Sequence, residues 1–116
     1  MELKFSFTSR TVDQVVILDC EGYFNQSAGE QISDFCYKKM GGGEIRFLLN
    51  FEKSPVMNSI GVSALIEIIG KLRPVSGKIG YINLSPIVAK TFKIMGLLNH
   101  SKIYTSEADA LLFLNS

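Results

Sequence analysis

The chain has 116 residues, of which 47% are hydrophobic, and its 12 Lys and Arg residues nearly balance its 11 Asp and Glu residues. This length and composition predict one folded domain over residues 1–116 and exclude a disordered chain. The net charge of +1, without a basic run, argues against nucleic-acid binding. Because no apolar stretch approaches about 18 residues and residues 1–10 alternate in polarity, we expect neither a membrane span nor a signal peptide.

The two cysteines and the single histidine offer little for a metal or catalytic site. Cys20 and Cys36 lack the spacing of metal ligands, so we expect two free thiols in a cytoplasmic protein. His100 lies in a polar connection that nothing in the sequence places near a serine, and the carboxylates are scattered. The glycines at 41–43 are not followed by the Lys and Ser or Thr of a phosphate-binding loop. The sequence therefore predicts no catalytic residue, no metal site and no cofactor, and argues against an enzyme.

The first half of the chain is predicted to form an antiparallel hairpin, a helix and a buried strand. Leu3, Phe5 and Phe7 alternate with polar residues, as in a strand with one exposed face, whereas residues 15–18 are all apolar, as in a strand buried on both faces. Ser27 and Glu30 have the spacing of a capping box. The predicted elements are strands around 3–7 and at 15–21 joined by a turn at 11–14, a loop at 22–26, a helix from Ser27 to the glycines at 41–43, and a strand at 45–51.

The second half of the chain is predicted to alternate between helices and strands. Asn58 is a good helix N-cap, and Pro74 stops the helix that follows. This helix is apolar around most of its circumference, so it must be covered on more than one side or expose a patch for a partner. The predicted elements are a loop at 52–57, a helix at 59–72, a strand at 78–84, a helix from Ser85-Pro86 to Gly96 with Val88, Phe92 and Met95 facing the core, an edge strand at 103–104, and a helix capped by Ser106 with Ala110, Leu111 and Leu114 facing inward.

The order of these elements predicts the fold class. A hairpin followed by alternating helices and strands gives β-β-α-β-α-β-α-β-α. In such a chain the later strands pair in parallel through right-handed crossovers. We therefore predict an α/β domain with a mixed sheet of four to five strands, an N-terminal antiparallel hairpin and about four helices, which cover one or both faces.

Ser59 is the residue on which the functional hypothesis depends. If Asn58 is the N-cap, Ser59 occupies the first helical position, among unpaired backbone N–H groups and at the positive end of the helix dipole. A phosphate attached to Ser59 would therefore lie where anions are favoured. The alternative is that Asn58 and Ser59 only start a helix, as such pairs usually do.

Four segments, in order along the chain, resemble the STAS domain family of anti-sigma factor antagonists. Residues 56–62, Val-Met-Asn-Ser-Ile-Gly-Val, are similar to the family signature Asp-Ser-(Ser/Thr)-Gly-Leu at a helix start. Residues 84–97 are similar to the segment in which Ser-Pro opens a helix and Gly-Leu closes it. Residues 103–111 resemble the last strand and helix of the family, and residues 22–25 stand where the family usually has Gly-x-Leu-Asp. The resemblance covers nearly the whole chain and implies a STAS-like fold.

The resemblance also implies a partner-binding switch. In this family an antagonist binds an anti-sigma factor that is a serine kinase of the GHKL type, and the sigma factor is thereby released for transcription. The kinase phosphorylates the serine that follows the Asp of the signature, and a serine phosphatase restores it. By this resemblance Ser59 is the phosphoacceptor. The helix cap and site loop comprise Met57, Asn58, Ile60 and Gly61, and the expected partner contacts are Asn25, Val56, Met57, Ile60 and Ser63.

Three positions depart from the family pattern. Asn58 and Asn25 stand where Asp is usual, which keeps a helix-capping residue but removes two negative charges near Ser59, and Ile60 replaces a small Ser or Thr. Two alternatives stand beside the phosphorylation switch. One is a constitutive STAS adaptor in a signalling or lipid-transport complex, and the other is a module that holds a nucleotide phosphate or another anion at the helix start. Val56 and Ile60 either contact a partner or pack under the loop.

Overall fold

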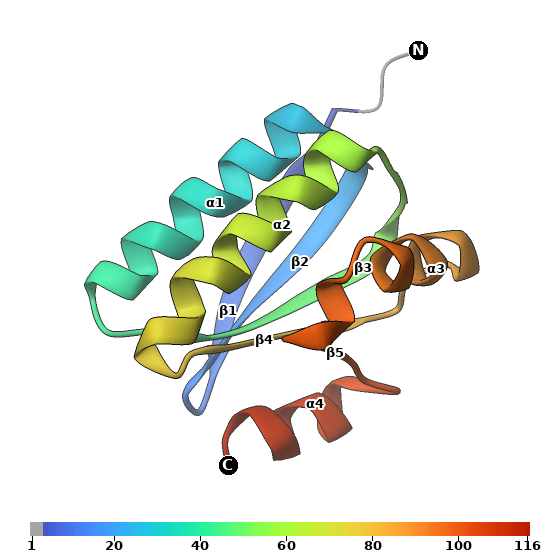
Figure 1. The fold of residues 1–116 in the computed structure, drawn as a ribbon. Helices are drawn as coiled ribbons and strands as arrows, with labels where there is room; N and C mark the ends of the chain where they lie inside the picture. The colour runs from blue at the N-terminus through green and yellow to red at the C-terminus, as the bar shows by residue number, and fades with distance from the viewer. Residues whose placement is uncertain (1–3) are drawn as a thin grey trace.

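The computed structural model describes residues 4–116, in which strands and helices alternate as the sequence predicts (Figure 1). The strands are β1 (Ser6–Val12), β2 (Val15–Phe24), β3 (Arg46–Met57), β4 (Lys78–Ile82) and β5 (Lys102–Ile103). The α-helices are α1 (Gln26–Gly41), α2 (Ser59–Leu72), α3 (Pro86–Ile94) and α4 (Glu107–Leu114), and short 3-10 helices, η1 (Arg73–Val75) and η2 (Leu97–Asn99), follow α2 and α3. The predicted α/β class is thus confirmed, while Leu3 of the predicted first strand lies outside the described residues.

The five strands form one mixed sheet in the order β1-β2-β3-β4-β5. β1 is antiparallel to β2, and all the other neighbouring strands are parallel, which confirms the predicted hairpin and crossovers. Val12 pairs with Val15, so the hairpin turn consists only of Asp13 and Gln14, with Asp13 in the left-handed region at φ 55°. The turn predicted at 11–14 is too long, because Thr11 and Val12 still pair with β2.

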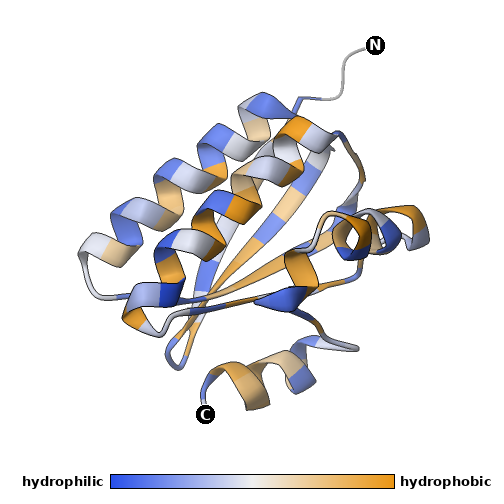
Figure 2. Ribbon diagram, in the orientation of Figure 1, coloured by the Kyte–Doolittle hydropathy of each residue, from blue (hydrophilic) through white to orange (hydrophobic). Residues whose placement is uncertain are grey.

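Hydrophobic clusters cover both faces of the sheet. Val16 and Leu18 belong to the cluster on the side of α1, α2 and α3, whereas Val15 and Ile17 belong to the cluster beneath α4. All four side chains are fully buried, which confirms that this part of β2 is covered on both faces. Figure 2 shows hydrophobic residues along the central strands and in α2, while α1 carries many hydrophilic residues. Among residues 4–116, no helix combines the length and apolarity needed to cross a bilayer.

β3 is longer than predicted, and its additional residues lead to the candidate site. The sequence predicts a strand end at residue 51 and a loop at 52–57, which is wrong because β2 also extends, to Phe24, and Met57 pairs with it. Within the extension, the buried Ser54 hydroxyl donates a hydrogen bond of 2.8 Å to the carbonyl of Gly22. The polar composition of 52–57 resembles a loop, but pairing with a neighbouring strand overrides such local preference.

The helix starts are set by caps, and one of them differs from the prediction. Asn25 is the N-cap of α1, and its Oδ1 accepts the N–H of Ala28 at 3.1 Å. The capping box predicted at Ser27 and Glu30 is therefore wrong, because Ser27 already lies inside the first turn. The predictions for α2 are confirmed at both ends and at its cap, Asn58.

The remaining elements follow the prediction with small shifts. β4 ends at Ile82, two residues before the predicted end, where Asn83 turns the chain with φ 61°. β5 begins at Lys102, one residue before the predicted edge strand. Ser106 caps α4 by accepting the N–H of Asp109 at 3.1 Å. Of the residues predicted to face inward, Val88, Phe92, Ala110 and Leu114 are buried, and Met95 and Leu111 are partly buried.

Candidate functional site

The candidate site is the start of α2, where β3 delivers the chain to the end of the sheet. Asn58 Oδ1 accepts the backbone N–H of Gly61 at 2.8 Å, and the Asn58 N–H donates to the carbonyl of Phe24 at 3.1 Å. Asn58 therefore both caps α2 and joins the start of this helix to β2. Ser59 is the first residue of α2, and its side chain is exposed. A group added to its hydroxyl would extend into solvent at the positive end of the helix dipole.

Two helix starts meet at this end of the sheet. A Cβ built on Gly61 would lie 2.4 Å from the Phe24 carbonyl oxygen and 2.9 Å from that of Asn25, so α2 packs directly against the backbone that leads into α1. A Cβ on Gly29 of α1 would lie 2.7 Å from the Cβ of Ala64 in α2. Residues from both starts line a shallow depression of about 440 Å³, namely Tyr23, Asn25, Gln26, Ser27, Glu30, Asn58 and Ile60. The structure thus brings Asn25 and Asn58, the two residues that stand where the family usually has Asp, to the same depression.

The segment that precedes Ser59 is held by two neighbouring elements, β2 and the start of α3. Besides the bonds from Ser54 to Gly22 and from Asn58 to Phe24, the Ser85 hydroxyl donates to the carbonyl of Pro55 at 3.0 Å. Ser85 occupies the predicted N-cap position of α3, but its side chain makes this contact with β3 instead of a capping bond. The position of Ser59 is therefore set by the sheet and by α3 as well as by its own helix.

The predicted partner-contact residues differ in exposure. Val56 is 54% exposed and Ile60 is 56% exposed, so the alternative in which both pack under the loop does not hold. Met57 and Asn25 are half-buried. Ser63 is exposed, and its hydroxyl donates to the carbonyl of Ser59 at 2.8 Å. Apolar surface therefore lies on either side of the Ser59 position along the chain.

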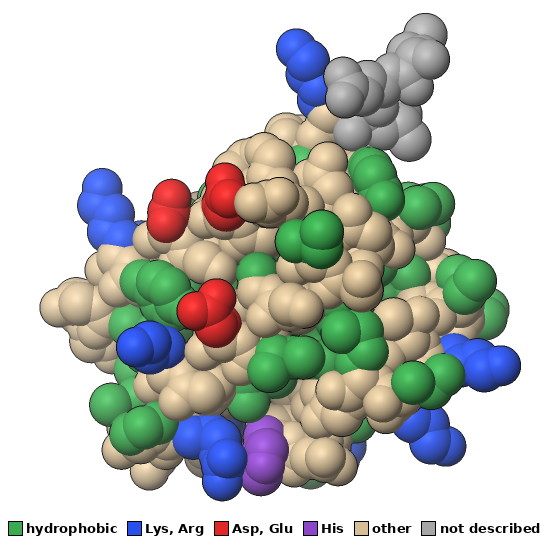
Figure 3. Space-filling model, turned by 45° about the horizontal axis from the view of Figure 1, so that its top comes forward, with side chains coloured by type: hydrophobic (Ala, Val, Ile, Leu, Met, Phe, Trp, Pro, Cys, Tyr) green, Lys and Arg blue, Asp and Glu red, His purple; other side chains and the backbone are tan. Residues whose placement is uncertain are grey.

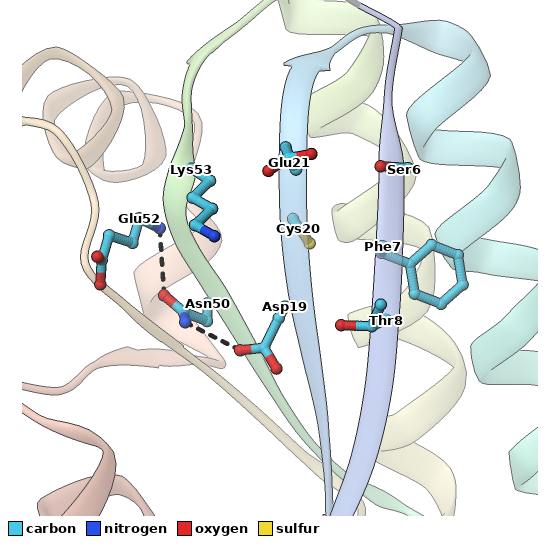
Figure 4. A pocket seen from close by; sticks show the side chains of 9 residues that line it. All are labelled: Ser6, Phe7, Thr8, Asp19, Cys20, Glu21, Asn50, Glu52 and Lys53. Atoms are coloured by element: carbon cyan, nitrogen blue, oxygen red, sulfur yellow. Dashed lines mark hydrogen bonds between the residues drawn. The ribbon is translucent and has the colours of Figure 1, made fainter.

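A polar patch lies on the α4 side of the sheet and is shown in part in Figure 4. It was not predicted from the sequence. Asp19 accepts hydrogen bonds from Arg10 Nε and Asn50 Nδ2, both at 2.9 Å, and Arg10 also pairs with Glu107 at the start of α4. The Arg10 guanidinium lowers the pKa of Asp19 and of Glu107. Beside these groups lies a depression of about 370 Å³, lined by Ser6, Phe7, Thr8, Asp19, Cys20, Glu21, Asn50, Glu52 and Lys53. Since Asn50 and Glu107 lie far along the chain from the hairpin that carries Arg10 and Asp19, no local pattern could have identified the whole group.

The cysteines and the histidine occupy other parts of the fold. Cys20 and Cys36 are free and buried, in agreement with the predicted free thiols. Burial raises the pKa of Cys36 to about 12 and raises the pKa of Cys20 as well, which keeps both thiols protonated near neutral pH. His100 lies exposed at the end of η2, where it borders a depression with Lys78 and Lys102.

We expect Asn58→Ala to lower the free energy of unfolding by about 0.5–2 kcal/mol, because the Gly61 N–H loses its acceptor. The matched control is Asn58→Asp, which keeps a side-chain acceptor and adds a negative charge at the positive end of α2. Urea unfolding followed by circular dichroism measures both variants. An Asn58→Ala protein as stable as the wild type would show that the cap does not hold the helix start.

Comparison with known proteins points to one family. Residues 6–110 match the family model of the STAS domain. The Bordetella bronchiseptica protein BtrV, named as a candidate anti-sigma factor antagonist, is 27% identical over 107 residues, which cover 91% of this chain and 92% of that protein.

Two solved structures share the fold. The phosphorylated form of the Bacillus cell fate determinant SpoIIAA has a TM-score of 0.71 and 27% identity, with 89% of this chain and 95% of that chain covered. The unphosphorylated form of the anti-sigma factor antagonist SpoIIAA has a TM-score of 0.77 and 23% identity, with coverage of 96% and 99%. Since the family match extends over most of the sequence, the chain belongs to the STAS domain family.

Proposed function

We propose that this chain is an anti-sigma factor antagonist that is inactivated by phosphorylation of Ser59. Its partner in this proposal is an anti-sigma factor with serine kinase activity of the GHKL type, and a serine phosphatase reverses the modification in the cytoplasm. The observation that carries the proposal is the exposed Ser59 side chain at the first position of α2. The similarity to BtrV and to both forms of SpoIIAA supports it.

The physical basis of the switch is the charge that a phosphate adds at this position. A phosphoserine carries about −1.5 to −2 charges near neutral pH. In the free domain the dipole of α2 favours that charge by about 0.3–1 kcal/mol. In a complex the same phosphate would enter a contact to which Val56 and Ile60, exposed and close to Ser59 along the chain, bring apolar side chains, and it would lose hydration there. Phosphorylation would thus weaken binding without unfolding the domain.

The test is incubation of the purified chain with ATP and the anti-sigma factor kinase of the same organism, followed by mass spectrometry. We expect one added phosphate, located on Ser59. The matched variants are Ser59→Ala, which should stay unmodified, and Ser9→Ala, which replaces an exposed serine of β1 and should be modified like the wild type. An active kinase that leaves Ser59 unmodified would contradict the proposal.

A constitutive adaptor is the second candidate, because Asn58 and Asn25 provide the caps of α2 and α1 without the negative charge of Asp. An adaptor in a signalling or lipid-transport complex would bind its partner with the same affinity as wild type, Ser59→Ala and Ser59→Asp. Selective loss of binding in Ser59→Asp would exclude it.

A further inference from the structure

The outer face of α3 exposes two large apolar side chains. Among residues 4–116, the two most exposed large hydrophobic side chains both belong to α3, Ile87 at 72% and Ile94 at 74%. They are seven residues apart, which places them on the same side of the helix two turns from each other. The opposite side holds Val88 and Phe92, which are buried in the core. Packing against the sheet therefore leaves the two isoleucines without cover in the free domain.

Two positive charges accompany these isoleucines. Lys90 and Lys93 are exposed on α3, and no carboxylate of residues 4–116 lies within 4.0 Å of either ammonium group. At the edge of the molecule near α3, Figure 3 shows hydrophobic and basic side chains next to each other. The outer face of α3 thus combines two apolar side chains with two lysines that form no salt bridge within residues 4–116.

The start of α3 is connected to the candidate site. The hydrogen bond from Ser85 to the carbonyl of Pro55 joins the start of α3 to the residue before Val56. Figure 1 shows α3 beside the segment that rises from β3 to the start of α2. The exposed side chains of Val56 and Ile60 lie on that segment and on the first turn of α2. The two apolar surfaces therefore lie on elements that are tied together.

We infer that the outer face of α3 is the second half of the docking surface, and that it binds an apolar patch with an acidic border on the anti-sigma factor kinase. The inference rests on the proposed function and names the chemistry of the partner. Charge complementarity supports it, since unpaired Lys90 and Lys93 attract carboxylates and gain most when those carboxylates approach beside a desolvated contact. An anionic membrane fits less well, because a nine-residue helix with two exposed isoleucines offers little apolar area for insertion.

An acidic partner surface would also explain how one phosphate blocks binding. Unmodified, the domain presents lysines and neutral apolar side chains to the carboxylates of the partner. After phosphorylation of Ser59, the carboxylates that approach the start of α2 would meet a phosphate with about −1.5 to −2 charges and would be repelled by it. The attraction by α3 and the repulsion at Ser59 would then act on the same partner surface.

The experiment measures binding of the purified anti-sigma factor kinase to defined variants by calorimetry. Ile87→Ser with Ile94→Ser should weaken binding about a hundredfold, about tenfold for each isoleucine that becomes buried. Lys90→Gln with Lys93→Gln should weaken binding about tenfold at low salt and reduce its salt dependence. Leu112→Ser on α4, where Leu112 is 70% exposed, and Lys38→Gln with Lys71→Gln on α1 and α2 are the matched controls and should bind like the wild type.

Each outcome separates the inference from the proposed function. If Ser59→Asp loses binding while the α3 variants bind like the wild type, the proposed function stands and the docking role of α3 is overturned. If the kinase does not bind the wild type, both are overturned. Cosedimentation with vesicles of phosphatidylglycerol and phosphatidylcholine in equal parts is a second arm. Binding of the wild type to these vesicles, lost in the α3 variants, would overturn the protein partner in favour of a membrane.

Discussion

Ser59→Asp is expected to weaken binding to the anti-sigma factor kinase by about a hundredfold, which corresponds to about 2.7 kcal/mol. The variant places a fixed negative charge at the exposed first position of α2, which Val56 and Ile60, both exposed, flank along the chain. In a complex this carboxylate would be desolvated without a partner of opposite charge. Isothermal titration calorimetry of the wild type, Ser59→Ala and Ser59→Asp measures the effect. Ser59→Ala should bind like the wild type, because it adds no charge.

The stability of Ser59→Asp distinguishes a charge effect from damage to the fold. An acidic residue in the first turn of a helix is favoured by the dipole by about 0.3–1 kcal/mol, so the variant should be at least as stable as the wild type. Equal binding by all three proteins would support the constitutive adaptor instead. The thermal unfolding of all three proteins is therefore measured beside their binding, because weak binding by a destabilised Ser59→Asp protein would reflect damage to the fold.

Gly61→Ala is expected to cost about 2–3 kcal/mol in the free energy of unfolding, the largest stability effect that we predict. The added Cβ would lie 2.4 Å from the carbonyl oxygen of Phe24 and 2.9 Å from that of Asn25. Both are backbone atoms at the junction of β2 and α1, so relief requires that α2 move away from the sheet. That movement would also displace Ser59, two residues earlier. We expect a fall of about 10 °C in the melting temperature.

Gly70→Ala is the matched control for Gly61→Ala. Gly70 lies in the same helix, is exposed, and has no atom of residues 4–116 within 4 Å of a built Cβ beyond its own helix and chain neighbours. Alanine is a better helix former than glycine, so this variant should gain up to about 1 kcal/mol. If Gly61→Ala were as stable as Gly70→Ala, the close approach between α2 and the start of α1 would be refuted.

The sequence was most informative where local chemistry determines the structure. The cap at Asn58, the apolar content of 59–72 and the proline after it act within a few residues, so both ends of α2 could be predicted. The alternation of strands and helices likewise predicted that the later strands pair in parallel. The position of Ser59 as the first residue of α2 followed from the same cap.

The predictions failed where structure depends on contacts between distant segments. The extension of β3 to Met57 requires pairing with β2, and the polar residues at 52–57 contain no sign of that pairing. Asn25 caps α1 although Ser27 and Glu30 fit the capping box better, because β2 continues to Phe24 and brings Asn25 to the helix start. The exposure of Ile87 and Ile94 also escaped prediction, since their apolar character alone suggests a core position.

The start of α2 combines a rigid base with an open surface. Gly61 and Asn58 fix the helix against β2, and Ser85 fixes the preceding segment to α3. Ser59, Ile60 and Val56 remain exposed on this base. A charge can therefore be added to the surface without rearrangement of the core, which is the property that a reversible binding switch requires.

The most direct measurement compares the unmodified chain with the stoichiometrically phosphorylated chain, by calorimetric titration against the kinase and by thermal unfolding of each form. Our account predicts that the phosphorylated form binds at least about a hundredfold more weakly, while its melting temperature is unchanged or slightly higher. Equal affinity of the two forms, or a loss of affinity that coincides with unfolding, would contradict it.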